Sequence, residues 1–528
     1  MLNVLNIKKK KYYIQIEAVN TSNFIFDTYD ISTIRGGSFI LLETIKKLEK
    51  SFPDELIPIS TAASIGLFKV EATEKVKNDL LKKIQDFINE NTQGHATFMI
   101  ACVEDEGQKF RVISETLQAQ IRRDQWRFPT IPIPEFGGTN IECFLDGWRP
   151  GVKQYVVSQN PDEGEMISAS THFRRERGRE IKHKLFKELL GDEYKDEICA
   201  KDLGLLARDS SKGVLNGKIA FLYIDGNTFG KIRKEKCIDD ETREKFDRVI
   251  QEGFRDLFLK ELLKKAKSDP DFVTNDEKGN PALRLEILLW GGDEVILVVP
   301  AWKGWDVLRL FYKLSEELTF ERIPLTHRAG VIFCHHNAPI LQIRELADKL
   351  MQKAKIDIQK KASNDNTGHD GWINHEQGDA FHYLALESFD MLTGNLDEFI
   401  EDYYKLAVRK DNFINTGTEK SEDGVIDRGK KAGYTDLLIR AHEMPLLMKQ
   451  LSILRKNLSF GKIIKIIQAL QVSNSTEIKA TKERMIELVG KEHREEVQDA
   501  ITAIESTSEQ RWYFLSDLWD YIPYWEGK

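Results

Sequence analysis

The feature that most constrains the fold of this 528-residue chain is an order of strands and helices that occurs twice. The first copy begins with a strand at residues 12–16 and a helix that runs from after Ser38 to Lys50. A pair of strands at 56–60 and 65–70, a helix at 74–89 and a strand at 96–103 follow. Apolar residues recur at strand or helix spacing in each of these stretches. The order is that of the ferredoxin-like βαββαβ fold, so we expect a mixed α+β protein.

The second copy repeats this order and adds one helix, at residues 218–224, 239–267, 282–289 with 295–300, 303–318, 326–334 and 340 to about 361. This recurrence predicts an internal duplication, in which Tyr13–Glu17 corresponds to Phe221–Asp225. After Gly371 the pattern is helical, apart from the polar stretch Asn415–Gly433. We therefore predict a βαββαβ domain at residues 1–140, a helical and irregular connector at 141–210, a second βαββαβ domain at 211–380 and a C-terminal helical domain at 381–528.

Gly291 and Gly292 lie between two apolar runs, a pattern that predicts the tight turn of a β-hairpin. Two acids, Asp293 and Glu294, follow at once. Carboxylates at a hairpin tip, beside glycines that let a ligand approach the backbone, suit Mg²⁺ and a nucleotide polyphosphate. The alternative is an ordinary Gly-Gly-Asp surface turn.

A second acid, Asp225, ends the strand at residues 218–224. A Mg²⁺ ion that bridges substrate phosphates needs acidic ligands from separate pieces of chain. The first and third strands of a βαββαβ domain are neighbours, so we expect Asp225 and Asp293 to lie close together. The first copy is expected to lack metal ligands, because Ala62, Ala63 and Ser64 stand near the positions of Gly292, Asp293 and Glu294.

Composition narrows the class of protein. Hydrophobic residues make up 41% of the chain and charged residues 31%, and neither a membrane-length apolar run nor a secretory signal is visible, so we expect a cytoplasmic location. The five cysteines form no CxxC pair, so we expect buried thiols, no disulfide framework and no zinc. A net charge of −8 argues against a general nucleic-acid coat protein. The basic segment 173–184 is interpreted as a solvated helix face, with an RNA contact as the alternative.

Residues 224–230 and Gly291–Val295 together resemble the palm domain shared by GGDEF nucleotide cyclases and the large subunit of type III CRISPR effector complexes. The segment Cys334–Ile340, and the helix that carries Leu346–Lys349 and Lys355, resemble the strand-to-helix step and the lysine-bearing helix of these families. Two tandem palms, the first degenerate, followed by a helical domain, are similar to the CRISPR large subunit or to a stand-alone cyclase of that type.

This resemblance implies a nucleotidyltransferase that uses Mg²⁺ or Mn²⁺ to join ATP into cyclic oligoadenylate messengers in antiviral defence. Its implied metal ligands are Asp225, Asp293 and the Ile224 carbonyl, and Glu294 would add charge or position the attacking hydroxyl. Nucleotide contacts are expected at Gly226, Asn227, Phe229, Gly230, Gly291, Gly292 and Lys355, with exposed backbone amides between Asn227 and Gly230. The implied partners are nucleoside triphosphates, guide or target RNA, and other type III CRISPR subunits, without a membrane.

The sequence departs from the CRISPR family in three respects, the first of which is that it has no CxxC zinc element. Its only His-Asp doublet, at residues 369–370, lies in a polar stretch, so we expect no HD nuclease domain and no metal-dependent DNase activity. Glu294 stands where that family usually has a second aspartate, which is closer to the GGDEF spelling. The alternatives are therefore a diguanylate-type cyclase, a non-catalytic palm-fold scaffold that binds RNA and partner proteins, or a regulator that only binds nucleotides.

Overall fold

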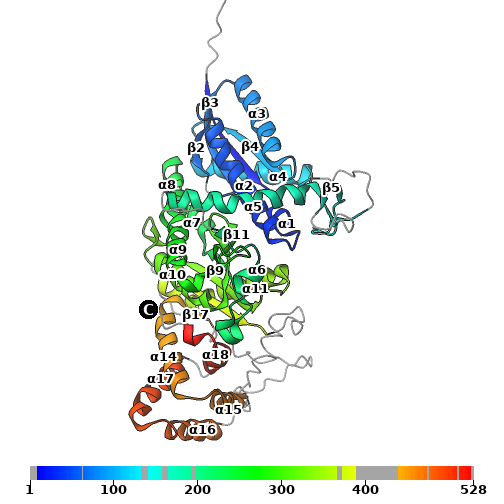
Figure 1. Cartoon of the computed structure of the whole chain (residues 1–528). Coiled ribbons are helices and arrows are strands. Elements are labelled where there is room, and N and C mark those ends of the chain that lie inside the picture. The colour runs from blue at the N-terminus through cyan, green and yellow to red at the C-terminus, as the bar shows by residue number, and fades with distance from the viewer. Residues whose placement is uncertain are drawn as a thin grey trace, which may run out of the picture.

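The computed structural model describes residues 9–61, 63–132, 141–156, 165–191, 198–364, 372–387, 438–471, 475–507 and 511–524. Along its long axis, Figure 1 shows a first α/β unit, a helix that crosses beneath it, a second α/β unit and a group of C-terminal helices. The predicted mixed α+β class is confirmed. Ala62, the doublet at residues 369–370 and the polar stretch Asn415–Gly433 lie outside the described residues.

Residues 10–127 form an antiparallel sheet with helices on both faces. Its elements are β1 (Lys10–Ala18), α1 (Thr21–Phe26), α2 (Ile31–Ser51), β2 (Ile57–Ser60), β3 (Ile65–Ala72), α3 (Glu74–Thr92), β4 (Phe98–Glu104) and α4 (Phe110–Arg127). The strand order is β2-β3-β1-β4. Alternate residues of β1 face opposite sides: Tyr12 and Ile14 pack with α2 and α3, whereas Tyr13 packs with α4.

The connector contains β5 (Val152–Val156), β6 (Met166–Ile167), α5 (Ala169–Leu190), β7 (Ile198–Cys199) and α6 (Leu203–Ala207). Helix α5 crosses α2 at two glycines, Gly36 and Gly178. A Cβ atom on Gly36 would lie 1.7 Å from the Arg174 carbonyl oxygen, and one on Gly178 would lie 1.9 Å from the Ser32 carbonyl oxygen. Helix α2 begins before the predicted helix and includes Gly36. The missing side chain of Gly36 lets the backbones of α2 and α5 touch.

The interpretation of segment 173–184 as a solvated helix face is wrong for Arg174 and Lys182, whereas the side chains of Arg179 and Lys184 are each 51% exposed. Arg174 is fully buried and its Nη1 donates to Asp27 over 2.7 Å. Lys182 Nζ donates to Glu286 over 2.6 Å. These partners lie more than a hundred residues away in sequence, so the basic pattern alone gave no sign that α5 packs its charges against other elements.

Glu286 joins three parts of the chain. Its side chain is 2% exposed and accepts hydrogen bonds from Arg35 of α2 and Lys182 of α5. Burial alone would raise the pKa of Glu286, but the charges of Arg35 and Lys182 outweigh it and lower that pKa. The first unit, the connector and the second unit therefore meet at one buried carboxylate.

Residues 218–385 build the second unit around a larger sheet. Its elements are β8 (Lys218–Gly226), α7 (Phe229–Lys236), α8 (Asp240–Ile250), a π-helical turn η4 (Gln251–Asp256), α9 (Leu257–Ser268), β9 (Val273–Asn275), β10 (Pro281–Leu283), β11 (Glu286–Trp290), β12 (Glu294–Pro300), α10 (Gly304–Ser315), β13 (Thr319–Phe320), β14 (Ile323–Pro324), β15 (His327–His335), α11 (Ile340–Asn364), α12 (His375–Gly378) and β16 (Ala380–Ala385). The sheet order is β11-β12-β8-β15-β16-β17, in which β17 is Ile439–Arg440. Its first four strands repeat the order and the antiparallel pairing of β2-β3-β1-β4.

Matching hydrogen bonds align the two sheets at one edge. The Ala18 amide donates to the Ser64 carbonyl over 2.9 Å, and the Gly226 amide donates to the Asp293 carbonyl over 3.2 Å. Ser64 therefore corresponds to Asp293, one residue away from the predicted alignment of Ser64 with Glu294.

The C-terminal part contains β17 (Ile439–Arg440), α14 (Met444–Asn457), α15 (Phe460–Gln471), α16 (Ser475–Glu487), α17 (Arg494–Thr507) and α18 (Trp512–Asp517). The prediction of helix alone after Gly371 is wrong, because β16 pairs parallel with β15 and extends the second sheet. A short apolar run such as Ala380–Ala385 fits a strand or a buried helix equally well. The domain boundary predicted after residue 380 falls on this strand, and the rest of the predicted division stays a prediction.

Four of the five cysteines are buried, as expected, and Cys102 is partly buried. Within the described residues, no helix combines the length and the apolar character that crossing a membrane requires.

Candidate functional site

The hairpin formed by β11 and β12 confirms the predicted tight turn. The Gly291 amide donates to the Glu294 carbonyl over 2.8 Å, so that only Gly292 and Asp293 lie between the two bonded residues. Neither Gly291 nor Gly292 has a positive φ. A Cβ atom on Gly292 would lie 3.4 Å from Ala63 Cβ of the first unit, and one on Gly291 would lie 3.1 Å from the Glu294 carbonyl oxygen. The tip therefore lies beside Ala63 of the first unit at an ordinary contact distance, and the tight contact of Gly291 is within the hairpin itself.

Three charged residues stand in a row across the second sheet. Glu294 of β12 lies directly opposite Asp225 of β8, and Asp225 lies directly opposite Arg328 of β15. Directly opposite residues of antiparallel strands point to the same face, so the three side chains are neighbours. The Arg328 guanidinium donates to the Asp225 carboxylate, whose side chain is 13% exposed.

Asp293 directly precedes Glu294 at the tip of the hairpin. It lines a recess of about 230 Å³ between the two α/β units. Arg233 and Arg243 of the second unit and Ser60 of the first unit also line this recess. Asp225 and Asp293 are thus near each other at one edge of the sheet, but only Asp293 lines the recess. No three Asp, Glu, His or Cys side chains are gathered as a metal site in the part of the chain that the structure describes.

The three acids influence one another. Burial raises the pKa of Asp225 to about 7, and the charges of Asp293 and Glu294 contribute to this rise, against the opposing charges of Arg328 and Lys355. Burial and then Asp293 raise the pKa of Glu294. Asp293 reaches solvent within its recess, yet desolvation by the surrounding protein raises its pKa too. Desolvation is therefore the main cause of all three raised pKa values, and neighbouring acids add to it for Asp225 and Glu294.

Asn227 is engaged in the structure of the sheet edge. Its amide donates to the Thr326 carbonyl over 2.8 Å, and its side-chain Nδ2 donates to the Gly378 carbonyl over 2.9 Å. Its Oδ1 accepts a hydrogen bond from Arg328 over 2.8 Å. The expected exposed amide at Asn227 is therefore wrong, because the chain stays paired with β15 for one residue beyond β8.

Phe229 and Gly230 lie beside Asp293, since all three line the same recess. Thr228 has a left-handed backbone, with φ of 59°, and this turns the chain from β8 into α7. A Cβ atom on Gly230 would meet no other atom within 4 Å, so its backbone is open to a ligand. Phe229 is 4% exposed and mainly packs in the core.

Lys355 and Ile224 are less exposed to solvent than Gly230 and Asp293. Helix α11, which carries Lys355, packs against β8 and β15, and the charge of Lys355 acts on Asp225. Ile224 is completely buried between Val295 and Ala329 in the sheet. The proposed roles of both residues stay predictions.

No protein-family model matches this sequence, and no curated protein matches it. Among solved structures, the Csm1-Csm4 cassette in complex with cA4 is similar over 98% of this chain and 70% of that chain, with 11% identity and a TM-score of 0.46. Csm1 in T.onnurineus is similar over 98% of this chain and 69% of that chain, with 10% identity and a TM-score of 0.46. The Csm1-Csm4 subcomplex in the type III-A CRISPR-Csm interference complex is similar over 98% of this chain and 70% of that chain, with 11% identity and a TM-score of 0.43. The structural neighbours are Csm1 chains.

Sequence reasoning missed two arginines at this site. Arg328 lies in a strand recognised by its apolar residues, and a charged residue inside such a strand was the available signal. Arg255 is 2% exposed, and its Nη1 donates to the Gly291 carbonyl over 2.8 Å. It projects from the π-helical turn η4, and π-helical turns change which residues of a helix share a face. Helical periodicity alone did not indicate that orientation.

Proposed function

We propose that this chain is a metal-dependent nucleotidyltransferase, with its site at the sheet edge formed by Asp225, Asp293 and Glu294. The second unit is then a palm domain and the first unit a degenerate copy of it. The observation that carries the proposal is the direct opposition of Asp225 and Glu294 on adjacent strands, with Asp293 at the hairpin tip next to them. The proposed reaction joins ATP into a cyclic oligonucleotide messenger in antiviral defence.

The donor atoms fit Mg²⁺ or Mn²⁺. Mg²⁺ prefers oxygen ligands and usually binds through one or two carboxylates, water and substrate phosphates. Asp225 and Asp293, with the Ile224 carbonyl as a further donor, would hold the ion, and their carboxyls are near each other at one edge of the sheet. When bound, such an ion lowers the pKa of an attacking hydroxyl and offsets charge on a triphosphate.

The side chains around the recess suit the rest of the substrate. Arg233 lines the recess beside Asp293 and brings positive charge to the place where phosphates would lie. The open backbone at Gly230, at the start of α7, offers amide donors to phosphate oxygens. Lys355 would add charge from α11, and Glu294 would position the attacking hydroxyl through its carboxylate.

Incubation of the purified chain with each labelled nucleoside triphosphate tests the proposal. The reactions contain Mg²⁺ or Mn²⁺, with and without RNA, and their products are separated by chromatography. AMPPNP, the ligand of a similar Csm1-Csm4 structure, serves as the non-reacting probe of binding. We expect oligoadenylate from ATP. A product from GTP alone would indicate a diguanylate-type cyclase, and no product from any triphosphate would reject the enzyme.

A non-catalytic scaffold is the second candidate function, and one observation favours it. Arg328 is 6% exposed at its side chain and neutralises Asp225, as a purely structural ion pair would. In that case the chain would bind RNA or other type III CRISPR subunits without nucleotidyl transfer.

We expect stabilisation by Mg²⁺ to depend on pH. Because the pKa of Asp225 is raised to about 7, this carboxyl is mainly protonated at about pH 6 and mainly ionised at about pH 8. A metal ligand must lose its proton, so Mg²⁺ should raise the melting temperature more at the higher pH. Scanning fluorimetry with and without MgCl₂ measures this difference. In Asp225→Asn the pH dependence should become smaller, and equal Mg²⁺ shifts at both pH values in the wild type would contradict the assignment.

A further inference from the structure

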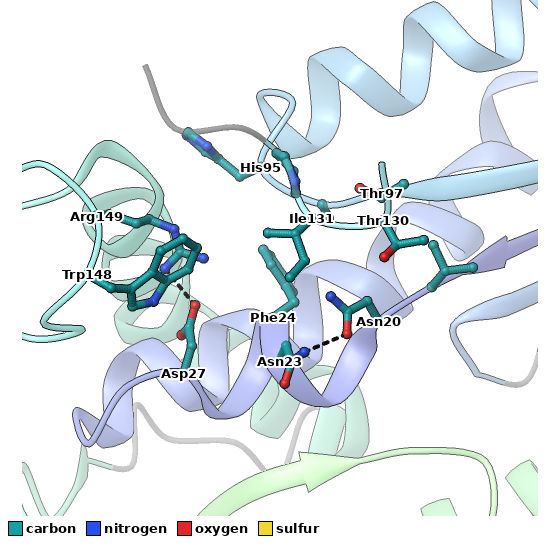
Figure 2. A pocket seen from close by; sticks show the side chains of 13 residues that line it. Asn20, Asn23, Phe24, Asp27, His95, Thr97, Thr130, Ile131, Trp148 and Arg149 are labelled. Carbon is teal, nitrogen blue, oxygen red and sulfur yellow. Dashed lines mark hydrogen bonds and ion pairs between the residues drawn. The ribbon is translucent and has the colours of Figure 1, made fainter. Parts of the chain in front are cut away.

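A second cavity, of about 300 Å³, lies in the first unit at the end of β1 (Figure 2). It is lined by residues just after β1, from α1, just before β4, from the segment after α4 and from the connector. None of the residues assigned to the nucleotidyl-transfer site lines it. Its volume is at the lower end of the range for small-molecule pockets.

The cavity has flat apolar walls. Phe24 is buried, whereas Trp148 and Ile131 remain 46% and 41% exposed. Figure 2 shows Trp148 and Arg149 to one side of Phe24 and two asparagines to the other side. The Arg149 guanidinium lies 4.0 Å from the centre of the Trp148 ring. An exposed tryptophan fixed in this way offers a surface on which a planar ring can stack.

The two asparagines, Asn20 and Asn23, present a paired polar edge. Asn23 Nδ2 donates to Asn20 Oδ1 over 2.8 Å. This bond leaves Asn20 Nδ2 as a donor and Asn23 Oδ1 as an acceptor, and neither has another hydrogen-bond partner among the described residues. Exchanging the oxygen and nitrogen of both amides still leaves one donor and one acceptor. A ring with an adjacent acceptor and donor would complement this edge.

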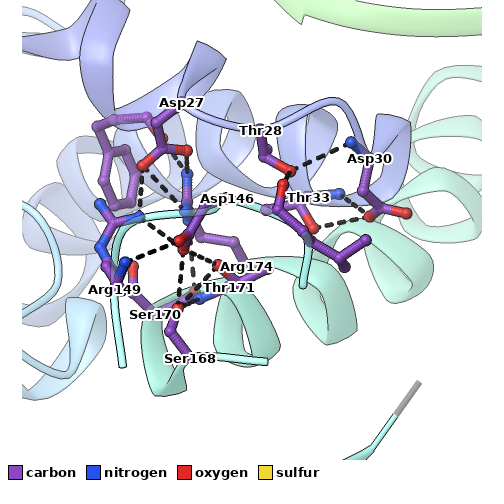
Figure 3. A network of polar contacts seen from close by, with 12 residues as sticks. Asp27, Thr28, Asp30, Thr33, Asp146, Arg149, Ser168, Ser170, Thr171 and Arg174 are labelled. Carbon is purple, nitrogen blue, oxygen red and sulfur yellow. Dashed lines mark hydrogen bonds and ion pairs between the residues drawn. The ribbon is translucent and has the colours of Figure 1, made fainter. Parts of the chain in front are cut away.

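The charges behind the cavity cancel one another, as the network in Figure 3 shows. Asp27 pairs with Arg149 over 2.6 Å and with Arg174 over 2.7 Å. Asp146 pairs with Arg149 over 3.0 Å. Two carboxylates thus face two guanidiniums, and Arg174 is fully buried. The network holds the cavity wall in place and leaves no net charge for a charged ligand to neutralise.

His95, which also lines the cavity, adds no positive charge at neutral pH. Burial lowers its pKa to about 4, and the charges of Arg174 and Arg149 act in the same direction. Its neutral imidazole offers one donor and one acceptor. Every polar group at the cavity is therefore neutral or already paired with an opposite charge.

From these contacts we propose that this cavity binds a neutral, planar heteroaromatic ring with an adjacent hydrogen-bond donor and acceptor, of the kind that a nucleoside carries. The ring stacks on Trp148 and its polar edge pairs with Asn20 and Asn23. This site is distinct from the edge that carries Asp225 and Asp293, and the proposal does not rest on nucleotidyl transfer.

Calorimetric titration of the full chain with adenosine, guanosine, cytidine and uridine tests the proposal, in buffer without divalent metal. We expect at least one nucleoside to bind. Trp148→Ala should weaken that binding roughly tenfold or more, because base stacking on an aromatic ring is lost. Asn23→Ala, at an exposed helix position, removes the acceptor and should also weaken it. A form of the same nucleoside in which methyl groups replace every hydrogen on the donor nitrogen lacks the donor, and it should bind the wild type more weakly.

Asp293→Ala separates this cavity from the proposed catalytic site, because it should leave nucleoside binding unchanged. Thermal unfolding of each variant checks that it is folded, and if Trp148→Ala is not, Asn23→Ala decides. The proposal is overturned if no nucleoside binds the wild type. It is also overturned if binding survives in the folded cavity variants, or disappears in Asp293→Ala while Trp148→Ala retains it.

Discussion

Asp293→Ala is expected to abolish the formation of oligonucleotide from ATP, with kcat/KM reduced by more than about a hundredfold. Changes to residues that merely support metal ligands already cost activity or affinity of about that size, and Asp293 is proposed as a ligand itself. The substitution removes a carboxylate from the recess, but the backbone carbonyl that accepts the Gly226 amide remains. The hairpin should therefore keep its shape. Initial rates with labelled ATP and Mg²⁺ measure the effect.

Ser64→Ala is the matched control for this variant. Ser64 occupies the position of Asp293 in the first unit, since its carbonyl accepts the equivalent hydrogen bond from Ala18. If only the second unit is catalytic, this variant should retain activity close to that of the wild type. A folded Asp293→Ala protein that still makes product at the wild-type rate would exclude Asp293 as a metal ligand.

Glu286→Gln is expected to lower the free energy of unfolding by about 3–5 kcal/mol, the usual cost of removing one partner from a buried ion pair. The change leaves the charges of Arg35 and Lys182 buried without their carboxylate. It therefore weakens the contact between α2, α5 and β11. Urea unfolding at neutral pH, followed by circular dichroism, measures the loss.

The same substitution at Glu180 is the control, because this residue makes a surface ion pair with Arg177 and its side chain is 66% exposed. Exposed pairs contribute little, so Glu180→Gln should change the free energy of unfolding by less than about 0.5 kcal/mol. Equal stability of the two variants would show that the buried carboxylate does not hold the units together.

Glu286 also bears on the proposed site. The recess beside Asp293 has one wall from the second unit and another from the first, where Ser60 and Ala63 lie. Because Glu286 belongs to β11, the strand that leads into the Gly291 hairpin, its contacts to α2 and α5 help to place that hairpin against the first unit. Loss of Glu286 is therefore expected to affect the site as well as stability.

Local patterns were sufficient for the hairpin and for the pairing of its acids with Asp225. Apolar runs on both sides of Gly291 and Gly292 predict two strands, and the repeated element order predicts that the third strand lies beside the first. Those rules predict that Asp225 and Asp293 lie close together, and the structure places Glu294, the residue after Asp293, directly opposite Asp225. Strand β16 was missed because a short apolar run does not distinguish a strand from a buried helix.

The sequence by itself therefore determined the mixed α+β class, the hairpin and the acids at one edge of the second sheet, because strand and helix periodicity is a local property. Only the tertiary structure decided that Arg328 pairs with Asp225, that Arg255 holds the Gly291 carbonyl and that Arg174 and Lys182 of α5 pack against distant carboxylates. Each of these depends on which distant residue packs beside a charge, and a buried charge is stable only where such a partner lies next to it.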